Sequence, residues 1–91
     1  MVKLEHDGKS LRLEGRLDIH SVKEALSTFK GLGARDCKRV DVKGLELLDT
    51  AGVQWLYWLA QRHGGALEVV HASKAVKATL KSAGFEPWVA S

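Results

Sequence analysis

The chain has 91 residues, of which 45% are hydrophobic and 27% are charged, and its formal net charge is +3. This length allows one domain with a single core, and the ordinary composition excludes a disordered chain. No apolar run reaches the roughly 18 to 20 residues that a membrane span needs, and no Arg-rich block indicates direct contact with nucleic acid. One cysteine and the lack of an apolar leader predict a cytoplasmic protein.

The first part of the chain is predicted to form a β-hairpin and a helix. Apolar and polar residues alternate over residues 2–6 and 10–15, and the Asp7-Gly8 pair between them is a strong hairpin signal. A Ser-x-x-Glu capping box starts at Ser21, and the apolar residues that follow recur at helical spacing until Gly31. We therefore expect two antiparallel strands followed by one amphipathic helix.

The rest of the chain alternates strands and helices. In order, the pattern predicts a strand at 39–43, a loop at 44–49, a helix from about 51 to 63, a strand at 67–70, and a helix that Ser73 caps and Gly84 ends. The core stripe of the middle helix is expected to consist of Val53, Leu56, Tyr57 and Ala60. Together these elements predict a single α/β domain with a mixed β-sheet of about four strands, in which helical crossovers join the parallel strands.

Thr50 lies where the middle helix is expected to begin. Its hydroxyl can accept a hydrogen bond from a backbone N–H of the first turn, which is the role of an N-cap. The same position faces the positive end of the helix dipole, where a phosphate group is well tolerated. Asp49 is expected either to fix the loop by accepting backbone N–H bonds or to shape a partner contact, and Gly52 is expected to allow close backbone approach. The residues alone leave both interpretations of Thr50 open.

Several segments occur together in the order found in a known family of domains. They are Gly15-Arg16-Leu17-Asp18 after a strand, Val40-Asp41-Val42 leading into Leu48-Asp49-Thr50-Ala51-Gly52-Val53, Gly64-Gly65, and Ser82-Ala83-Gly84-Phe85 at the end of the last helix. In this order and spacing they resemble the STAS domain, the sulphate-transporter and anti-sigma-factor-antagonist module. The resemblance covers nearly the whole chain and implies a STAS-like domain over residues 1–91.

The resemblance also implies a function. The family's Asp-Ser/Thr-x-Gly phosphorylation motif falls on residues 49–52, with Thr50 as the residue that a partner kinase phosphorylates. In anti-sigma-factor antagonists, which regulate transcription, the unmodified domain binds a serine/threonine kinase of histidine-kinase-like ATPase fold that is also the anti-sigma factor, and phosphorylation releases it. The resemblance implies a partner-binding surface that consists of Asp18, Asp49, Thr50, Ala51, Gly52, Gln54, Trp55 and Trp58.

Two alternatives remain open at this point. The short STAS subunit of the lipid-asymmetry ABC transporter carries a similar Asp-Thr-x-Gly segment and binds the ATPase of that transporter, so a non-enzymatic subunit of a lipid-transport ABC complex is the second expectation. Trp55 and Trp58 are either an exposed docking face, which could equally form a homodimer, or oversized core residues.

Other kinds of chemistry have little support in the sequence. His6, His20, His63 and His71 are dispersed, without a pair at metal-ligand spacing. Gly64-Gly65 follows a helix instead of preceding one, which is unlike a phosphate-binding loop. We therefore expect no metal, no other cofactor and no enzymatic activity.

Overall fold

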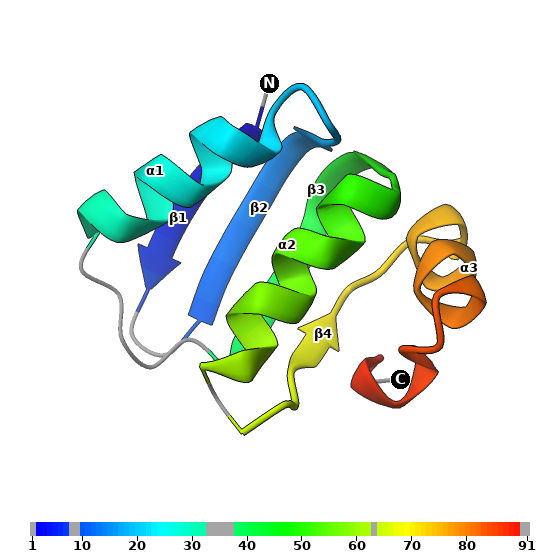
Figure 1. Cartoon of the computed structure of the whole chain (residues 1–91). Coiled ribbons are helices and arrows are strands. Elements are labelled where there is room, and N and C mark those ends of the chain that lie inside the picture. Colours follow the sequence, from blue (N-terminus) through cyan, green and yellow to red (C-terminus); the bar gives the residue numbers. More distant parts are fainter. Residues whose placement is uncertain (1, 8–9, 33–37, 63, 90–91) are drawn as a thin grey trace.

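The computed structural model describes residues 2–7, 10–32, 38–62 and 64–89, so part of the predicted Asp7-Gly8 turn and His63 lie outside the described residues. In chain order the elements are β1 (Val2–Asp7), β2 (Ser10–Leu17), α1 (Val22–Leu32), β3 (Arg39–Leu48), α2 (Thr50–Gln61), β4 (Glu68–Val70), α3 (Lys74–Ser82) and the short 3-10 helix η1 (Glu86–Trp88). The order of strands and helices agrees with the prediction (Figure 1).

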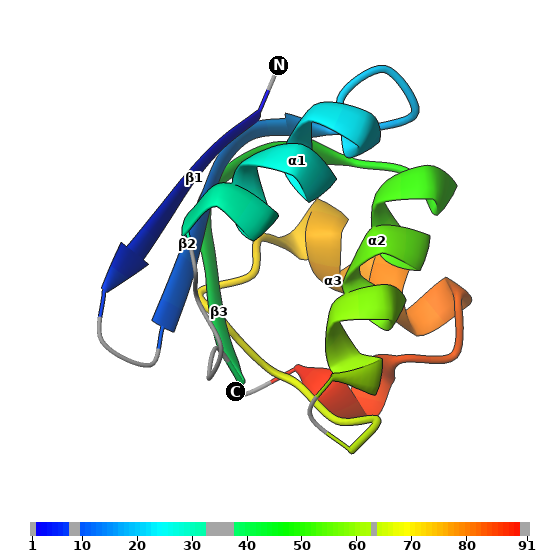
Figure 2. The ribbon, with the colours of Figure 1, turned by 60° about the vertical axis from the view of Figure 1, so that its left-hand side comes forward.

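The strands form one mixed sheet. Its order is β1-β2-β3-β4, with β1 antiparallel to β2 and the other neighbours parallel. The hairpin register pairs Val2 with Gly15 and Asp7 with Ser10. Figure 2 shows the helices gathered on one face of the sheet, as expected when helical crossovers connect parallel strands. The predicted α/β fold with a four-stranded mixed sheet is confirmed.

The core lies between the sheet and the helices. Leu11 and Leu13 of β2 and Val40 and Val42 of β3 are almost completely buried, and the residues between them point to the opposite face. From α2, which has no charged residue, the buried set is Gly52, Val53, Trp55, Leu56, Leu59 and Ala60. Because so much of α2 is buried, only a narrow strip of this helix reaches solvent.

The prediction of a loop at residues 44–49 is wrong. The third strand, β3, continues to Leu48, which pairs with Leu17 of β2. The register between these strands shifts at two places, between Arg12 and Glu14 and between Gly15 and Arg16. Such irregularities interrupt the period of two by which strands are recognised. The second half of β3 therefore has no clear strand pattern in the sequence.

The core stripe predicted for α2 also needs correction. Tyr57 is 48% exposed, whereas Trp55 and Leu59 are buried. The reason is packing against α1, where the ring of Phe29 meets Trp55 edge-on with 6.1 Å between ring centroids. The buried side of α2 is therefore turned toward α1, which leaves Tyr57 on the other side.

Charged residues cross the sheet on the face opposite the core. Asp41 lies 3.2 Å from the Nδ1 atom of His71 and 4.0 Å from the Nε atom of Arg12, and it accepts a hydrogen bond from the Lys43 N–H. Partial burial raises the pKa of Asp41. The Lys43 N–H, the ring of His71 and the guanidinium of Arg12 together outweigh this effect, so the pKa of Asp41 lies below its ordinary value.

We predict that Asp41→Asn lowers the free energy of unfolding by about 0.5 to 1 kcal/mol at neutral pH. Because the pKa of Asp41 is lower in the folded chain than in the unfolded chain, its carboxylate stabilises the fold above the unfolded pKa. This contribution is lost as the pH falls through the folded pKa. Urea denaturation of both proteins measures the difference in unfolding free energy, once at neutral pH and once at a pH well below the ordinary Asp pKa of about 3.9.

The matched control is Glu46→Gln, which removes an exposed carboxylate from the same strand. Its effect on the unfolding free energy should be small at both pH values. If Glu46→Gln lowered the free energy of unfolding as much as Asp41→Asn does, the stabilising role of the Asp41 contacts would be contradicted.

Candidate functional site

The helix α2 begins at the end of the sheet where β2 and β3 both finish. Asp49 has an extended backbone, and its Oδ1 atom accepts a hydrogen bond from the Gly52 N–H at 3.0 Å. Asp49 is therefore the N-cap, and Thr50 is the first helical residue. The interpretation of Thr50 as the cap is wrong, because the carboxylate one residue earlier already binds the first turn. The Thr50 side chain is left exposed to solvent.

Asp49 also binds the turn that follows β2. Its Oδ2 atom accepts a hydrogen bond from the N–H of Ile19, thirty residues earlier, at 3.2 Å. Its own N–H donates to the carbonyl oxygen of Leu17 at 3.3 Å. The prediction that Asp49 fixes this region by accepting backbone N–H bonds is confirmed. One carboxylate thus joins two segments that are far apart in the sequence.

Gly52 allows the close contact between α2 and β2. A Cβ atom at this position would lie 2.3 Å from the carbonyl oxygen of Leu17 and 2.7 Å from the Cδ1 atom of Leu48. The Leu48 side chain can move, but the backbone oxygen cannot move without displacing the strand. The predicted close approach at Gly52 is confirmed, and it lets the start of α2 pack against the end of β2.

Asp18 has a structural role in the turn between β2 and α1. Its side chain is mostly buried, and its Oδ1 atom accepts hydrogen bonds from the His20 N–H at 3.0 Å and the Ser21 hydroxyl at 3.2 Å. Burial raises the pKa of Asp18, but these hydrogen bonds outweigh it, so the pKa lies below its ordinary value. The Asp18 carboxylate therefore has a structural role in its own turn, and a contact of this residue with a partner stays a prediction.

Ser21 does not form the predicted capping box with Glu24. Its hydroxyl turns back and lies 2.7 Å from the carbonyl oxygen of Arg16, while its own oxygen accepts the Asp18 N–H at 2.9 Å. The helix α1 still begins at Val22, as the sequence predicted. Ser21 therefore closes the turn in front of α1 and leaves no exposed hydroxyl there.

Two exposed apolar side chains lie at the same end of the sheet as Thr50. Ile19, in the turn after β2, is 69% exposed, and Leu47, next to the last residue of β3, is 37% exposed. Neither residue was among the predicted site residues. The signal for Ile19 was an isoleucine between Asp18 and His20, in a turn outside every strand and helix pattern.

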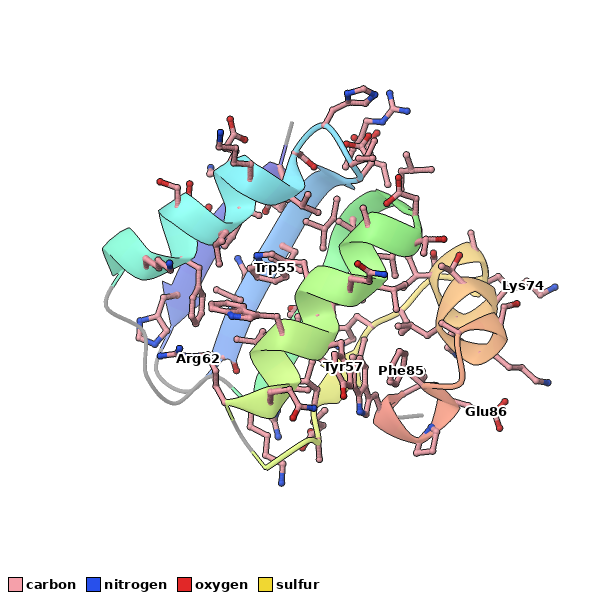
Figure 3. The ribbon with its side chains drawn as sticks, in the orientation of Figure 1. Trp55, Tyr57, Arg62, Lys74, Phe85 and Glu86 are labelled. Atoms are coloured by element: carbon pink, nitrogen blue, oxygen red, sulfur yellow. The ribbon has the colours of Figure 1, made fainter. Side chains whose placement is uncertain are left out.

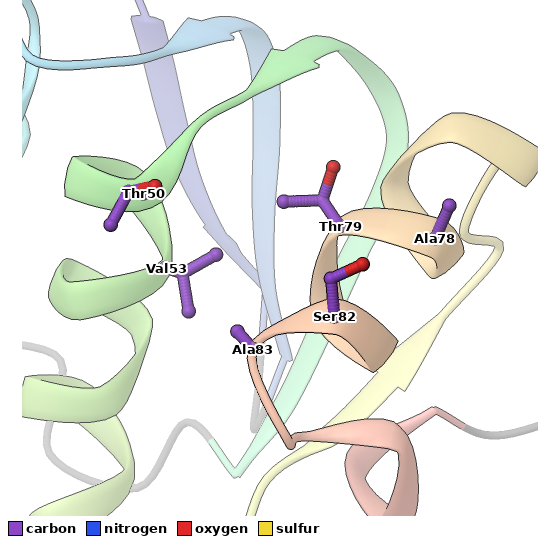
Figure 4. A pocket seen from close by; sticks show the side chains of 6 residues that line it. All are labelled: Thr50, Val53, Ala78, Thr79, Ser82 and Ala83. Atoms are coloured by element: carbon purple, nitrogen blue, oxygen red, sulfur yellow. The ribbon is translucent and has the colours of Figure 1, made fainter.

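A groove separates the first half of α2 from α3 (Figure 4). It has a volume of about 500 Å³, and its lining residues are Thr50, Val53, Ala78, Thr79, Ser82 and Ala83. A second hollow of about 300 Å³ continues it along α2 to Gln54, Tyr57 and Phe85. Among the described residues, the lining of the larger hollow carries hydroxyls and methyl groups but no ionisable side chain. Such a lining favours recognition by shape over acid–base catalysis.

The two tryptophans of α2 face α1 and not this groove. Trp55 is 5% exposed, and Trp58 is half-buried with its ring 5.7 Å from that of Phe29. The guanidinium of Arg62 lies 5.3 Å from the centre of the Trp58 ring. Figure 3 shows Trp55 on the α1 side of the helix and Tyr57 near Phe85. Of the two interpretations left open, Trp55 fits that of a core residue, whereas Trp58 is partly exposed. Both side chains also line a hollow of about 380 Å³ together with residues of α1, so a contact of these residues with a partner stays a prediction.

Within the described residues, no group of three or more His, Cys, Asp or Glu side chains is arranged to hold a metal ion. None of the helices in that part of the chain has the length and apolar character required to cross a membrane.

Comparison with known proteins identifies the family. Residues 2–89 match the family described as "Mlab, STAS domain", so the chain belongs to the STAS domain family, as its motifs predicted. The fold is similar to that of the anti-sigma factor antagonist SpoIIAA in its unphosphorylated form. The TM-score is 0.74 at 19% sequence identity, over 99% of this chain and 86% of that chain. No curated protein matches the sequence significantly.

We predict that Gly52→Ala lowers the free energy of unfolding by about 2 to 4 kcal/mol, because the new methyl group would overlap the Leu17 carbonyl oxygen. The matched control is Gly31→Ala in α1, where no neighbouring atom lies within 4 Å of the added Cβ. This change should raise the free energy of unfolding by about 0.5 to 1 kcal/mol. Urea denaturation measures both values, and equal effects of the two substitutions would show that the contact at Leu17 is unimportant.

Proposed function

We propose that this chain is a partner-switching regulator of the anti-sigma-factor-antagonist type. In its unmodified form it binds a serine/threonine kinase that is also an anti-sigma factor, and phosphorylation of Thr50 releases it. The observation that carries the proposal is the exposed side chain of Thr50, next to the groove between α2 and α3. The likeness in fold to SpoIIAA in its unphosphorylated form supports the same class of function.

In this proposal the chain supplies the acceptor and the kinase supplies the catalysis. The Oγ1 atom of Thr50 forms a bond to the γ-phosphorus of ATP, ADP leaves, and a base on the kinase takes the hydroxyl proton. Among the hydrogen bonds of the described residues, none uses the Thr50 hydroxyl, because Asp49 caps the helix in its place. The acceptor oxygen is therefore free to enter a kinase active site without disturbing α2.

The added phosphate would change the surface in a way that opposes docking. It carries a charge of about −1.5 to −2 at neutral pH, beside the carboxylate of Asp49. Thr50 lines a groove whose other lining residues are uncharged. A protein that fits this neutral groove would have to remove the water around a dianion. This desolvation costs free energy unless the docking protein places a cationic side chain against the phosphate. Release of the partner follows.

We predict that the cognate kinase and ATP add one phosphate to the chain, at Thr50. Thr50→Val keeps the shape of the side chain but lacks the hydroxyl, so it should bind the kinase and remain unmodified. The control is Thr79→Val, which removes another hydroxyl from the same groove and should be phosphorylated normally. Tandem mass spectrometry locates the phosphate, and labelling of Thr50→Val at an unchanged level would disprove the assigned site.

The second candidate is a non-enzymatic subunit that contacts the ATPase of a lipid-transport ABC complex. The match to the family described as "Mlab, STAS domain" favours it, together with the resemblance of residues 49–52 to the segment of such a subunit. In this case Thr50 and the groove would touch the ATPase directly and no modification would occur. Both candidates place the chain in the cytoplasm.

Purification of the native complex distinguishes the two candidates. A kinase of histidine-kinase-like ATPase fold in the complex, released on addition of ATP, supports partner switching. An ABC ATPase that stays bound in the presence of ATP, with Thr50 unmodified in the mass spectrum, supports the transporter subunit and removes the first candidate. A second copy of the chain as the only partner would contradict both.

A further inference from the structure

We infer that the hollow between α1 and α2 binds a small apolar carboxylate, one oxygen of which accepts a hydrogen bond from the indole N–H of Trp55. This α1–α2 hollow has a volume of about 380 Å³. It lies on the α1 side of α2, where Figure 3 shows Trp55, whereas the groove beside Thr50 lies on the α3 side. Binding in the α1–α2 hollow would therefore be an activity in addition to the proposed switch at Thr50.

The indole nitrogen of Trp55 is a buried donor that lacks an acceptor. Trp55 lines the α1–α2 hollow and is 5% exposed, and its Nε1 atom has no hydrogen-bond partner among the described residues. The large majority of buried polar side-chain atoms in native proteins are paired, because an unpaired one loses its water without compensation. The rings of Phe29 and Trp58 lie beside Trp55, with 6.1 and 6.2 Å between ring centroids, but an aromatic ring is only a weak acceptor. A ligand in the hollow could supply the missing acceptor.

The lining of the α1–α2 hollow favours a ligand with an apolar body. Val22 and Leu26 of α1 and Trp58 of α2 line it, and all three are partly buried hydrophobic residues that pack against the core. Their remaining exposed surface faces water when the hollow is empty, and a ligand that covers this surface gains the hydrophobic contribution. The volume lies toward the lower end of the range of about 300 to 1,000 Å³ for small-molecule pockets. The ligand is therefore a small molecule.

The charges at the α1–α2 hollow favour an anion. Lys23 is the one ionisable side chain in the lining that the structure describes, and it is exposed. The guanidinium of Arg62 lies 5.3 Å from the centre of the Trp58 ring and adds a second cation. Glu24, which follows Lys23 on α1, is not part of the lining. A carboxylate would be attracted by these cations and would accept a stronger hydrogen bond from Trp55 than a neutral oxygen does.

Octanoate is the probe for this site, and octylammonium is its matched control. The two ions have the same apolar chain, but octylammonium has no acceptor and carries the opposite charge. Proton–nitrogen correlation NMR gives each tryptophan indole N–H its own signal. Octanoate should move the Trp55 signal downfield, as a new hydrogen bond does, with a dissociation constant on the order of 1 mM. Octylammonium should bind at least about tenfold more weakly.

Two substitutions separate the hydrogen bond from the charge. Trp55→Phe keeps an aromatic ring in the core but removes the N–H, so the affinity for octanoate should fall by about tenfold. Lys23→Gln should lower the affinity for octanoate by about threefold without weakening octylammonium. The control is Lys30→Gln, which removes an exposed cation from the last turn of α1 and should change neither affinity.

The backbone amide signals of the buried residues Leu11 and Val40 report whether each variant keeps its fold. If Trp55→Phe unfolds, the downfield shift in the unmodified chain and the effect of Lys23→Gln decide the question. A Trp55 indole signal that does not move at octanoate concentrations of about ten times the expected dissociation constant overturns the site.

Equal affinities of octanoate and octylammonium also overturn the proposal, because they would show hydrophobic contact alone. The same holds if folded Trp55→Phe binds octanoate as tightly as the unmodified chain does. None of these measurements involves a kinase or a change at Thr50. Their outcome is therefore independent of whether the proposed partner switching is correct.

Discussion

The carbonyl oxygen of Leu17 is the point on which the arrangement of the site depends. It accepts the Asp49 N–H, and it leaves no room for a Cβ atom at Gly52. Because the end of β2 and the start of α2 meet at this oxygen, β3 can pass into α2 at Thr50 with only Asp49 between them. The threonine is therefore placed by two rigid elements instead of a long loop. Sites held in this way keep their geometry when a partner arrives.

Most of the fold could be predicted from the sequence, because most elements have a regular pattern. Alternation defines the hairpin strands, and Ser73 caps α3 through the Val76 N–H as expected. The second half of β3 was missed since its register against β2 shifts twice. The interpretation of Thr50 as the N-cap was wrong for a different reason. Aspartate and threonine are both good caps, and the sequence does not say which of two neighbours takes the position.

The exposed residues of the site were harder to predict than the buried ones. A helix without charged residues, such as α2, has no polar face that tells which side meets solvent. Tyr57 was therefore wrongly expected in the core, and the burial of Trp55 was left open, although both belong to the helix as predicted. Ile19 was missed because it belongs to no periodic element. Its exposure depends on the hydrogen bonds of Asp18 and Asp49, which only the folded chain brings together.

In α2, one residue caps the helix and the next presents an exposed hydroxyl, two roles that a single serine or threonine can also combine. Since the aspartate stabilises the helix start, the hydroxyl of the neighbouring threonine makes no contribution on which folding relies. The side chain at position 50 can then differ without loss of the hydrogen bond that caps α2. Stability of the helix start and the chemistry of the residue beside it are thereby set by two separate side chains.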